Sequence, residues 1–227
     1  MLLFDWMKTN VISVTPDTSL RQCRRLLKEH KINRLPVVDA EKIVVGLISS
    51  ENVKTFSPKG ATGLEIIELL EVMEEAKAKD VMVVAPETIL YTATVEQAAM
   101  RMRDKRVPCL PVVNEEDKLV GIVSGWDIFK ALLAMSGAEH PGMEAAFVVP
   151  DREGTLKVIL DEFKKYGMRI VSVLSSAYVN GTRQVKIRFF GGDEDGKAAI
   201  LKQFSEHPGL RYWSHDSEMF IKDKPKF

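Results

Sequence analysis

Cysteine is scarce in this chain, which contains only Cys23 and Cys109. Cys23 falls within a predicted helix and Cys109 begins a predicted strand, so we expect both to be buried free thiols. No disulfide framework is predicted from two such residues. The four histidines are scattered and show neither an HExxH pattern nor Cys/His ligand spacing. We therefore predict no metal centre and no required cofactor.

Long apolar runs are lacking as well. No segment approaches the roughly 20 apolar residues that cross a bilayer, and the start, Met1–Lys8, shows no signal-peptide pattern. We expect a cytoplasmic protein without a membrane partner. Charge of one sign is also missing, because 32 Lys and Arg residues balance 32 Asp and Glu residues. A dominant nucleic-acid surface would show a basic excess, so no nucleic-acid partner is expected.

Catalytic motifs are absent too. The sequence contains no Gly-x-x-x-x-Gly-Lys-Ser/Thr, no Gly-x-Gly-x-x-Gly and no Gly-x-Ser-x-Gly, and nothing pairs a nucleophile with a base. These absences argue against an enzyme and favour a protein that binds or regulates.

What the chain does contain is an internal repeat. Residues 35–52 read LPVVDAEKIVVGLISSEN, and residues 110–127 read LPVVNEEDKLVGIVSGWD. The two stretches keep a constant offset of 75 residues without a gap, which aligns Gly46 with Gly121 and Asn52 with Asp127. Each stretch predicts two strands joined by a charged turn and followed by the start of a helix.

A strand and a helix precede each stretch, so the repeating unit is β-α-β-β-α. Residues 11–15 and 88–91 are the predicted first strands, and Ser19 and Thr94 are helix N-cap candidates. A lone copy has an apolar face that it cannot cover, so we expect the two copies to pack together. The predicted boundaries are 1–57 for the first copy, 58–79 for a helical linker and 80–136 for the second copy.

A Gly- and Pro-containing linker at 137–143 separates the repeat from residues 144–227. This last part predicts the order β-α-β-β-α-β of the ferredoxin-like plan. Asn180-Gly181 is a strong hairpin signal within it, and one final strand is expected over 210–221. The predicted fold class is therefore α/β (α+β).

The repeat resembles the cystathionine-β-synthase (CBS) domain, which occurs as a tandem pair also called a Bateman module. The resemblance covers about residues 1–135 and rests on Leu-Pro-Val-Val, Val-Gly and Ser-x-x-Asp/Asn in each copy. The stretch Asp151-Arg-Glu-Gly-Thr-Leu156 is similar to the signature of the ACT family of small regulatory domains, with Glu153 where Pro is common. The CBS-CBS-ACT order resembles the acetoin-utilisation AcuB type of protein.

The CBS resemblance implies a regulatory site for an adenine-containing ligand: AMP, ADP, ATP or S-adenosylmethionine. In nucleotide-binding CBS pairs the Asp of the motif holds the ribose hydroxyls and the Ser contacts phosphate, which points to Asp127 and Ser124. Independently, a carboxylate at a helix start can accept two hydroxyl donors, and a Ser there lies beside free N–H groups that favour anions. In the first copy Ser49 and Asn52 take these places. An amide carries no charge, so that cleft is expected to bind more weakly.

Three further residues complete the predicted nucleotide site. Arg34 is the best candidate to neutralise phosphate, because no basic residue follows Ser49 or Ser124 directly. Ser13 and Thr88 lie on the first strand of each copy, at a position that often lines the cleft. An alternative is that Ser49 and Ser124 are plain helix caps.

For the C-terminal part, the resemblance implies an amino-acid ligand or a role in assembly. The candidate ligand residues share the loop before its first helix: Asp151, Arg152, Gly154, Thr155 and Leu156. The alternative is a purely structural turn that needs the backbone freedom of Gly154. The resemblance also suggests a homodimer. A different hypothesis is a ligand-free adaptor that docks an unidentified target protein.

Overall fold

The computed structural model describes residues 1–55, 75–177, 180–215 and 218–222. These residues form two units, Met1–Ala131 and Leu132–Phe227, which are considered separately. The mixed α/β fold class is confirmed. Most of the helical linker predicted over 58–79 lies outside the described residues.

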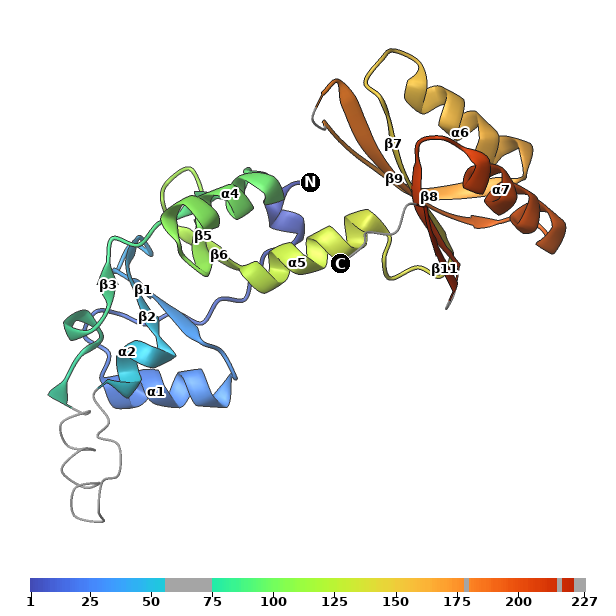
Figure 1. Cartoon of the computed structure of the whole chain (residues 1–227). Coiled ribbons are helices and arrows are strands. Elements are labelled where there is room, and N and C mark those ends of the chain that lie inside the picture. Colours follow the sequence, from blue (N-terminus) through green and yellow to red (C-terminus); the bar gives the residue numbers. More distant parts are fainter. Residues whose placement is uncertain (56–74, 178–179, 216–217, 223–227) are drawn as a thin grey trace. The chain divides into compact units, whose positions relative to one another are not determined.

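Two copies of the repeat make up the first unit (Figure 1). Residues 11–15 contribute only one parallel bridge, Val14 to Val37, in place of the expected strand. The elements of the first copy are η1 (Leu3–Asp5), α1 (Leu20–Glu29), β1 (Arg34–Val38), β2 (Val44–Ser49) and α2 (Ser50–Lys54). Those of the second are η2 (Ala78–Asp80), β3 (Val83–Val84), β4 (Ile89–Leu90), α4 (Val95–Lys105), β5 (Cys109–Val113), β6 (Leu119–Ser124) and α5 (Gly125–Ser136).

The predicted helix caps are confirmed. The Ser19 side chain accepts a hydrogen bond of 3.3 Å from the backbone N–H of Gln22 at the start of α1. Thr94 does the same for Gln97 at 3.2 Å, and the Gln97 side chain reaches back to the Thr94 N–H at 2.8 Å. This reciprocal capping box satisfies two donors that the first turn of α4 leaves without helical partners.

The leading segment of each copy belongs structurally to the other copy. Lys8 exchanges main-chain hydrogen bonds of 2.9 and 3.0 Å with Ile122 of β6, and η1 places Leu3 in the core of the second copy. In the other direction, β3 pairs with β2, and η2 places Ala78 in the core of the first copy. Leu3 and Ala78 are both fully buried. Leu3 and Ala78 are 75 residues apart, so they are equivalent positions of the repeat, and each lies in the core of the other copy.

Two equivalent glycines make room for this exchange. Met82 lies directly over Gly46, where a Cβ would clash with its side chain. Met7 lies over Gly121, and a Cβ there would stand 2.6 Å from Met7 Sδ and 3.1 Å from the main-chain oxygen of Lys8. Only a residue without a side chain lets the two backbones approach this closely.

The second unit is a five-stranded antiparallel sheet with two helices. Its strand order is β11-β10-β7-β9-β8, so the predicted β-α-β-β-α-β order is present. The elements are β7 (Met143–Pro150), α6 (Thr155–Lys165), β8 (Met168–Ala177), β9 (Thr182–Gly191), α7 (Glu194–Glu206), β10 (Leu210–His215) and β11 (Glu218–Ile221). Asn180 and Gly181 have φ angles of 64° and 68°, as a tight hairpin turn between β8 and β9 requires.

The prediction of one final strand over 210–221 is wrong. Residues 210–221 hold two antiparallel strands, β10 and β11, which pair from Tyr212–Ile221 to His215–Glu218. The Trp213 and Phe220 rings stack across them with centroids 5.8 Å apart. The polar run 214–218 (SHDSE) was the signal that could have divided this stretch, although it contains no Gly, Pro or Asn.

Candidate functional site

The Ser-x-x-Asp motif of the second copy lies at the junction of β6 and α5. The backbone N–H and the hydroxyl of Ser124 both donate hydrogen bonds to Oδ2 of Asp127, at 2.9 and 2.5 Å. Asp127 is only 4% exposed, although it is a carboxylate. Both of these bonds use the same carboxylate oxygen, Oδ2.

The first copy repeats this geometry with an amide. The Ser49 N–H and hydroxyl donate to Oδ1 of Asn52 at 2.9 and 2.5 Å, and the Asn52 N–H donates to Ser49 Oγ at 3.0 Å. A helix-capping role is therefore shared by both motifs. Because the amide oxygen of Asn52 is used in the cap, its remaining polar group is an NH2, which donates where a carboxylate oxygen would accept.

Arg34, the predicted phosphate partner, contacts the second copy. Its guanidinium lies against the thiol of Cys109, the residue that pairs with Ser124 across β5 and β6. Burial raises the pKa of Cys109, and the nearby positive charge of Arg34 offsets part of that increase. The guanidinium is held by a 2.9 Å hydrogen bond to the main-chain oxygen of Asn33. The structure thus brings Arg34 to the strand neighbour of Ser124.

Cys109 is a site neighbour that the sequence reasoning missed. It stands 75 residues after Arg34, so the two residues are equivalent positions of the repeat that face one another. Ile43 and Lys118 are another equivalent pair, and they form a bridge between the copies. A pair of copies related by an approximate two-fold axis brings equivalent residues together in this way. The 75-residue offset was the signal that could have identified Cys109.

Thr88 lies apart from this cluster. It precedes β4, which pairs with β5, and β5 separates β4 from the strand that ends at Ser124. Thr88 lines a wide groove of about 1030 Å³ that also includes Glu115 and Asp117 of the turn between β5 and β6. Its main-chain oxygen accepts a hydrogen bond from Arg101. Ser13 is half-buried beside the bridge that Val14 makes.

In the second unit, the loop after β7 shows structural contacts. Asp151 forms an ion pair with Arg183, with 2.9 Å between Oδ1 and Nε, although the Nε–H direction does not align for a hydrogen bond. Gly154 has a φ of +81° at the start of α6, a conformation that favours glycine. Thr155 begins α6, and Leu156 packs against the core. Arg152 is exposed. An amino-acid ligand at this loop stays a prediction.

A polar network covers part of the sheet in the same unit. Glu144 accepts a hydrogen bond of 2.5 Å from the Tyr212 hydroxyl and forms ion pairs of 3.0 Å with Lys186 and 3.2 Å with Arg188. Burial alone would raise the pKa of Glu144, but the Tyr212 and Lys186 hydrogen bonds and the two positive charges outweigh it and lower that pKa. Burial and this carboxylate together raise the pKa of Tyr212.

No cluster for a metal ion occurs among the described residues: nowhere do three His, Cys, Asp or Glu side chains come together suitably. The described helices also include none that is long and apolar enough to span a membrane. Both cysteines are buried free thiols, as predicted, and burial raises the pKa of Cys23 to about 11.

Comparison with known proteins agrees with the repeat. The model of the CBS domain matches residues 3–58 and 78–134. An inosine-5'-monophosphate dehydrogenase of Korarchaeum cryptofilum is 32% identical over 149 residues, which cover 66% of this chain but only 26% of that enzyme. An uncharacterized protein of Methanocaldococcus jannaschii is 32% identical over 155 residues, covering 59% of this chain and 92% of that protein.

A solved structure shows the same architecture. The CBS-pair protein CBSX2 from Arabidopsis thaliana is 28% identical and superposes with a TM-score of 0.52, covering 58% of this chain and 94% of CBSX2. The part of the chain that it covers is close in extent to the predicted pair of copies.

Proposed function

Because the chain belongs to the CBS domain family and carries two copies of that domain in tandem, we propose that it is a non-catalytic regulatory protein whose CBS pair binds an adenine-containing ligand. The observation that carries this proposal is the buried Asp127 carboxylate, 4% exposed, with one oxygen in the helix cap and the other unused by it. Burying a charge is costly unless a partner compensates it, so a role in binding would explain its presence.

The site chemistry fits a nucleotide. A carboxylate oxygen can accept from the two vicinal hydroxyl groups of a ribose. Arg34 offers planar N–H donors to a phosphate close to Ser124. This positive charge favours AMP, ADP or ATP over the sulfonium of S-adenosylmethionine at the Asp127 cleft.

The two clefts are expected to differ. In the first copy, Asn52 presents NH2 where Asp127 presents an acceptor, and Cys109 stands at the position equivalent to Arg34. That cleft therefore lacks the ribose acceptor, although Arg34 is the strand partner of Ser49 in this copy. One nucleotide per chain, bound at the Asp127 cleft, is the expected stoichiometry.

Helix α5 offers a route from ligand to response. It begins beside Asp127 in the first unit and ends at Ser136 in the second, whose main-chain oxygen accepts a 2.7 Å hydrogen bond from Ser172. Arg188 holds the following linker by two bonds, of 3.2 and 3.0 Å, to the main-chain oxygen of His140. A ligand that prefers one position of α5 would bias these contacts, with a coupling free energy of about 1–3 kcal/mol.

The C-terminal unit is proposed to be an ACT-like regulatory domain, and the whole protein a cytoplasmic homodimer. The β-α-β-β-α-β order and the loop Asp151–Leu156 support the ACT proposal. Dimer formation is favoured by four large apolar side chains that α5 leaves exposed by 44–68%: Trp126, Phe129, Leu132 and Leu133. Apolar surface of this kind on one helix usually marks an interaction face.

Calorimetric titration of AMP, ADP, ATP and S-adenosylmethionine into the wild type and Asp127→Ala tests the proposal. We expect heat with at least one nucleotide and its loss in the variant. No heat with any of the four at millimolar concentration would contradict it.

The second candidate function is a ligand-free adaptor, for which the exposed apolar face of α5 is the specific observation. In that case Asp127→Ala would leave partner binding unchanged, and light scattering on Phe129→Ser would show a smaller particle than the wild type.

A further inference from the structure

The groove of about 1030 Å³ in the second copy lies beside β4, which is the outermost strand of the sheet β4-β5-β6 as the described residues define it. Its wall combines β4 and the segment after it with α4 and the turn between β5 and β6. Ile89 and Val113 are buried in this wall, whereas Leu90 and Met100 are 45% and 47% exposed. Half-exposed apolar side chains beside a concave surface are typical of a binding face.

The main chain of β4 is poorly suited to accept a further strand. An incoming strand would bind to main-chain groups along the free edge of β4. Two carbonyl oxygens here already accept hydrogen bonds from within the chain. That of Thr88 accepts from the Arg101 side chain, and that of Leu90 accepts from the Ala93 N–H at 3.0 Å. We therefore expect a partner to bind through its side chains, and not as an added strand.

The end of the groove where β4 begins is basic. Arg101 of α4 donates to the main-chain oxygen that directly precedes β4. Lys105, one turn further along α4, forms an ion pair of 2.8 Å with Glu87, and Asp104 pairs with Arg103 at 2.8 Å. These five residues carry three positive and two negative charges. Both ion pairs are exposed to solvent, and pairs of this kind contribute little, so their cations can take a new partner at small cost.

The end of the groove where β4 stops is acidic. Leu90, the last residue of β4, pairs with Val113, and the turn that follows Val113 places Glu115 and Asp117 in the groove wall. Both carboxylates are exposed. The hydroxyl of Tyr91, which follows β4, donates a hydrogen bond to Glu115 and keeps it at this end. The groove is thus basic at one end and acidic at the other, with exposed apolar side chains between them.

We propose that this groove is a docking surface for a second copy of the chain, arranged about a two-fold axis. A surface that is basic at one end and acidic at the other is complementary to itself, because the rotation brings the basic end of each copy to the acidic end of the other. The turn with Glu115 and Asp117 then lies against Arg101 and Lys105 of the second copy. Leu90 of both copies is covered at the centre. This surface is distinct from the apolar face of α5, and the inference does not depend on the proposed ligand.

The charge pattern is particular to the second copy. The residues 75 positions earlier in the first copy are Leu26 for Arg101, His30 for Lys105, Ala40 for Glu115 and Lys42 for Asp117. Two identical folds therefore differ at all four positions that would make the contact. The arrangement of charges in the groove is not a requirement of the repeat itself.

Charge reversal in the full-length chain tests the proposal. The variant Arg101→Glu/Lys105→Glu makes both ends acidic, and Glu115→Lys/Asp117→Lys makes both ends basic. Each alone should self-associate at least tenfold more weakly than its parent. An equimolar mixture of the two restores opposite charges at both contacts and should regain the parent's association. The parent is Phe129→Ser, which weakens contacts through α5, and sedimentation velocity at low ionic strength over a range of protein concentrations gives the association constants.

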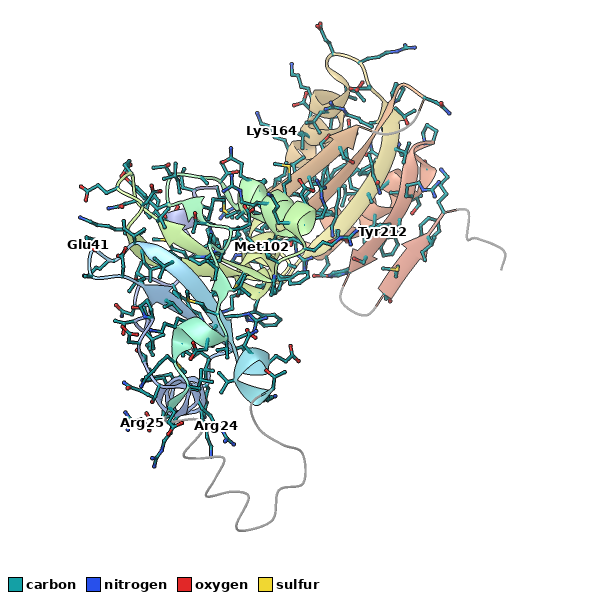
Figure 2. The ribbon with its side chains drawn as sticks, turned by 90° about the vertical axis from the view of Figure 1, so that its left-hand side faces the viewer. Arg24, Arg25, Glu41, Met102, Lys164 and Tyr212 are labelled. Carbon is teal, nitrogen blue, oxygen red and sulfur yellow. The ribbon has the colours of Figure 1, made fainter. Side chains whose placement is uncertain are left out.

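A matched control reverses two exposed charges elsewhere, in Arg25→Glu/Lys28→Glu. Figure 2 shows Arg25 on α1, at the side of the first unit that is remote from α4. This control should associate like the parent. Three outcomes would overturn the proposal: a parent that stays monomeric at every concentration, an equal loss in the control, or a mixture that stays dissociated. All the reversed side chains are exposed, so the fold should persist, and urea denaturation of each variant checks this.

Discussion

The substitution Asp127→Asn separates the two roles that the structure gives to this residue. An Asn at this position can accept the two Ser124 hydrogen bonds, because Asn52 does so in the first copy with the same distances of 2.9 and 2.5 Å. The cap should therefore survive. The loss of the carboxylate charge near a helix start costs about 0.3–1 kcal/mol, so the free energy of unfolding should fall by no more than that.

Ligand binding should respond much more strongly. Once the amide oxygen is used in the cap, the side chain presents NH2 to the ribose, and the charged acceptor is lost. A hydrogen bond to a charged group contributes about 1.5–3 kcal/mol. Since 1.4 kcal/mol corresponds to a factor of ten, nucleotide affinity should fall by about 10- to 150-fold.

Two measurements on each variant separate the effect on stability from the effect on ligand binding. Urea denaturation gives the free energy of unfolding, and calorimetry gives the dissociation constant for AMP. Asp127→Ala serves as the control, because it removes the buried acceptor and should lose about 1–3 kcal/mol of stability as well as binding. Wild-type affinity in Asp127→Asn would refute the assignment of the ribose to this carboxylate. A large loss of stability in Asp127→Asn would refute the equivalence of the two caps.

Three further results are expected. The pKa of Glu144 is lowered in the folded protein, so this carboxylate stabilises the fold above the ordinary carboxyl pKa, and the stabilisation is lost as pH falls through the folded pKa. Glu144→Gln should therefore have a lower free energy of unfolding at pH 7 and a smaller decrease of that free energy in acid. Denaturation at pH values from 7 to 3 measures both. Gly121→Ala should lower the unfolding free energy of the first unit by about 1–3 kcal/mol, because the new Cβ meets Met7 and a backbone oxygen; unchanged stability would show that the exchanged segment moves aside easily. Cys23 and Cys109 should resist a thiol reagent at pH 8 until the protein unfolds, because burial raises both thiol pKa values, and rapid labelling of the native protein would contradict this.

The local elements of the repeat were predictable because each depends on nearby residues. The two strands expected within residues 35–52 are β1 and β2, and the helix expected to start at the end of residues 110–127 is α5. Ser19 and Thr94 were identified as caps from residue type and position alone. The βαββαβ order was likewise predictable from periodicity and the Asn-Gly turn.

What depends on distant contacts was not predictable. Periodicity shows that a segment is apolar but not which sheet it joins, so the exchange of the leading segments left no local signal. The role of Thr88 stays a prediction: this residue precedes β4, and β5 lies between that strand and β6. For Asp127 and Asn52 the sequence predicted a chemical difference. It could not show that both side chains accept from the N–H and the hydroxyl of the serine three positions earlier.

The exchanged segments also constrain how the chain can fold during synthesis. Ala78 completes the core of the first copy, so this copy can fold fully only after the first residues of the second copy have been synthesised. Lys8 can pair with Ile122 only after about 114 further residues have been added to the chain. Contacts of such long sequence separation slow folding and keep apolar surface exposed on the nascent chain. A single copy released on its own would lack part of its core, so the pair should behave as one cooperative folding unit.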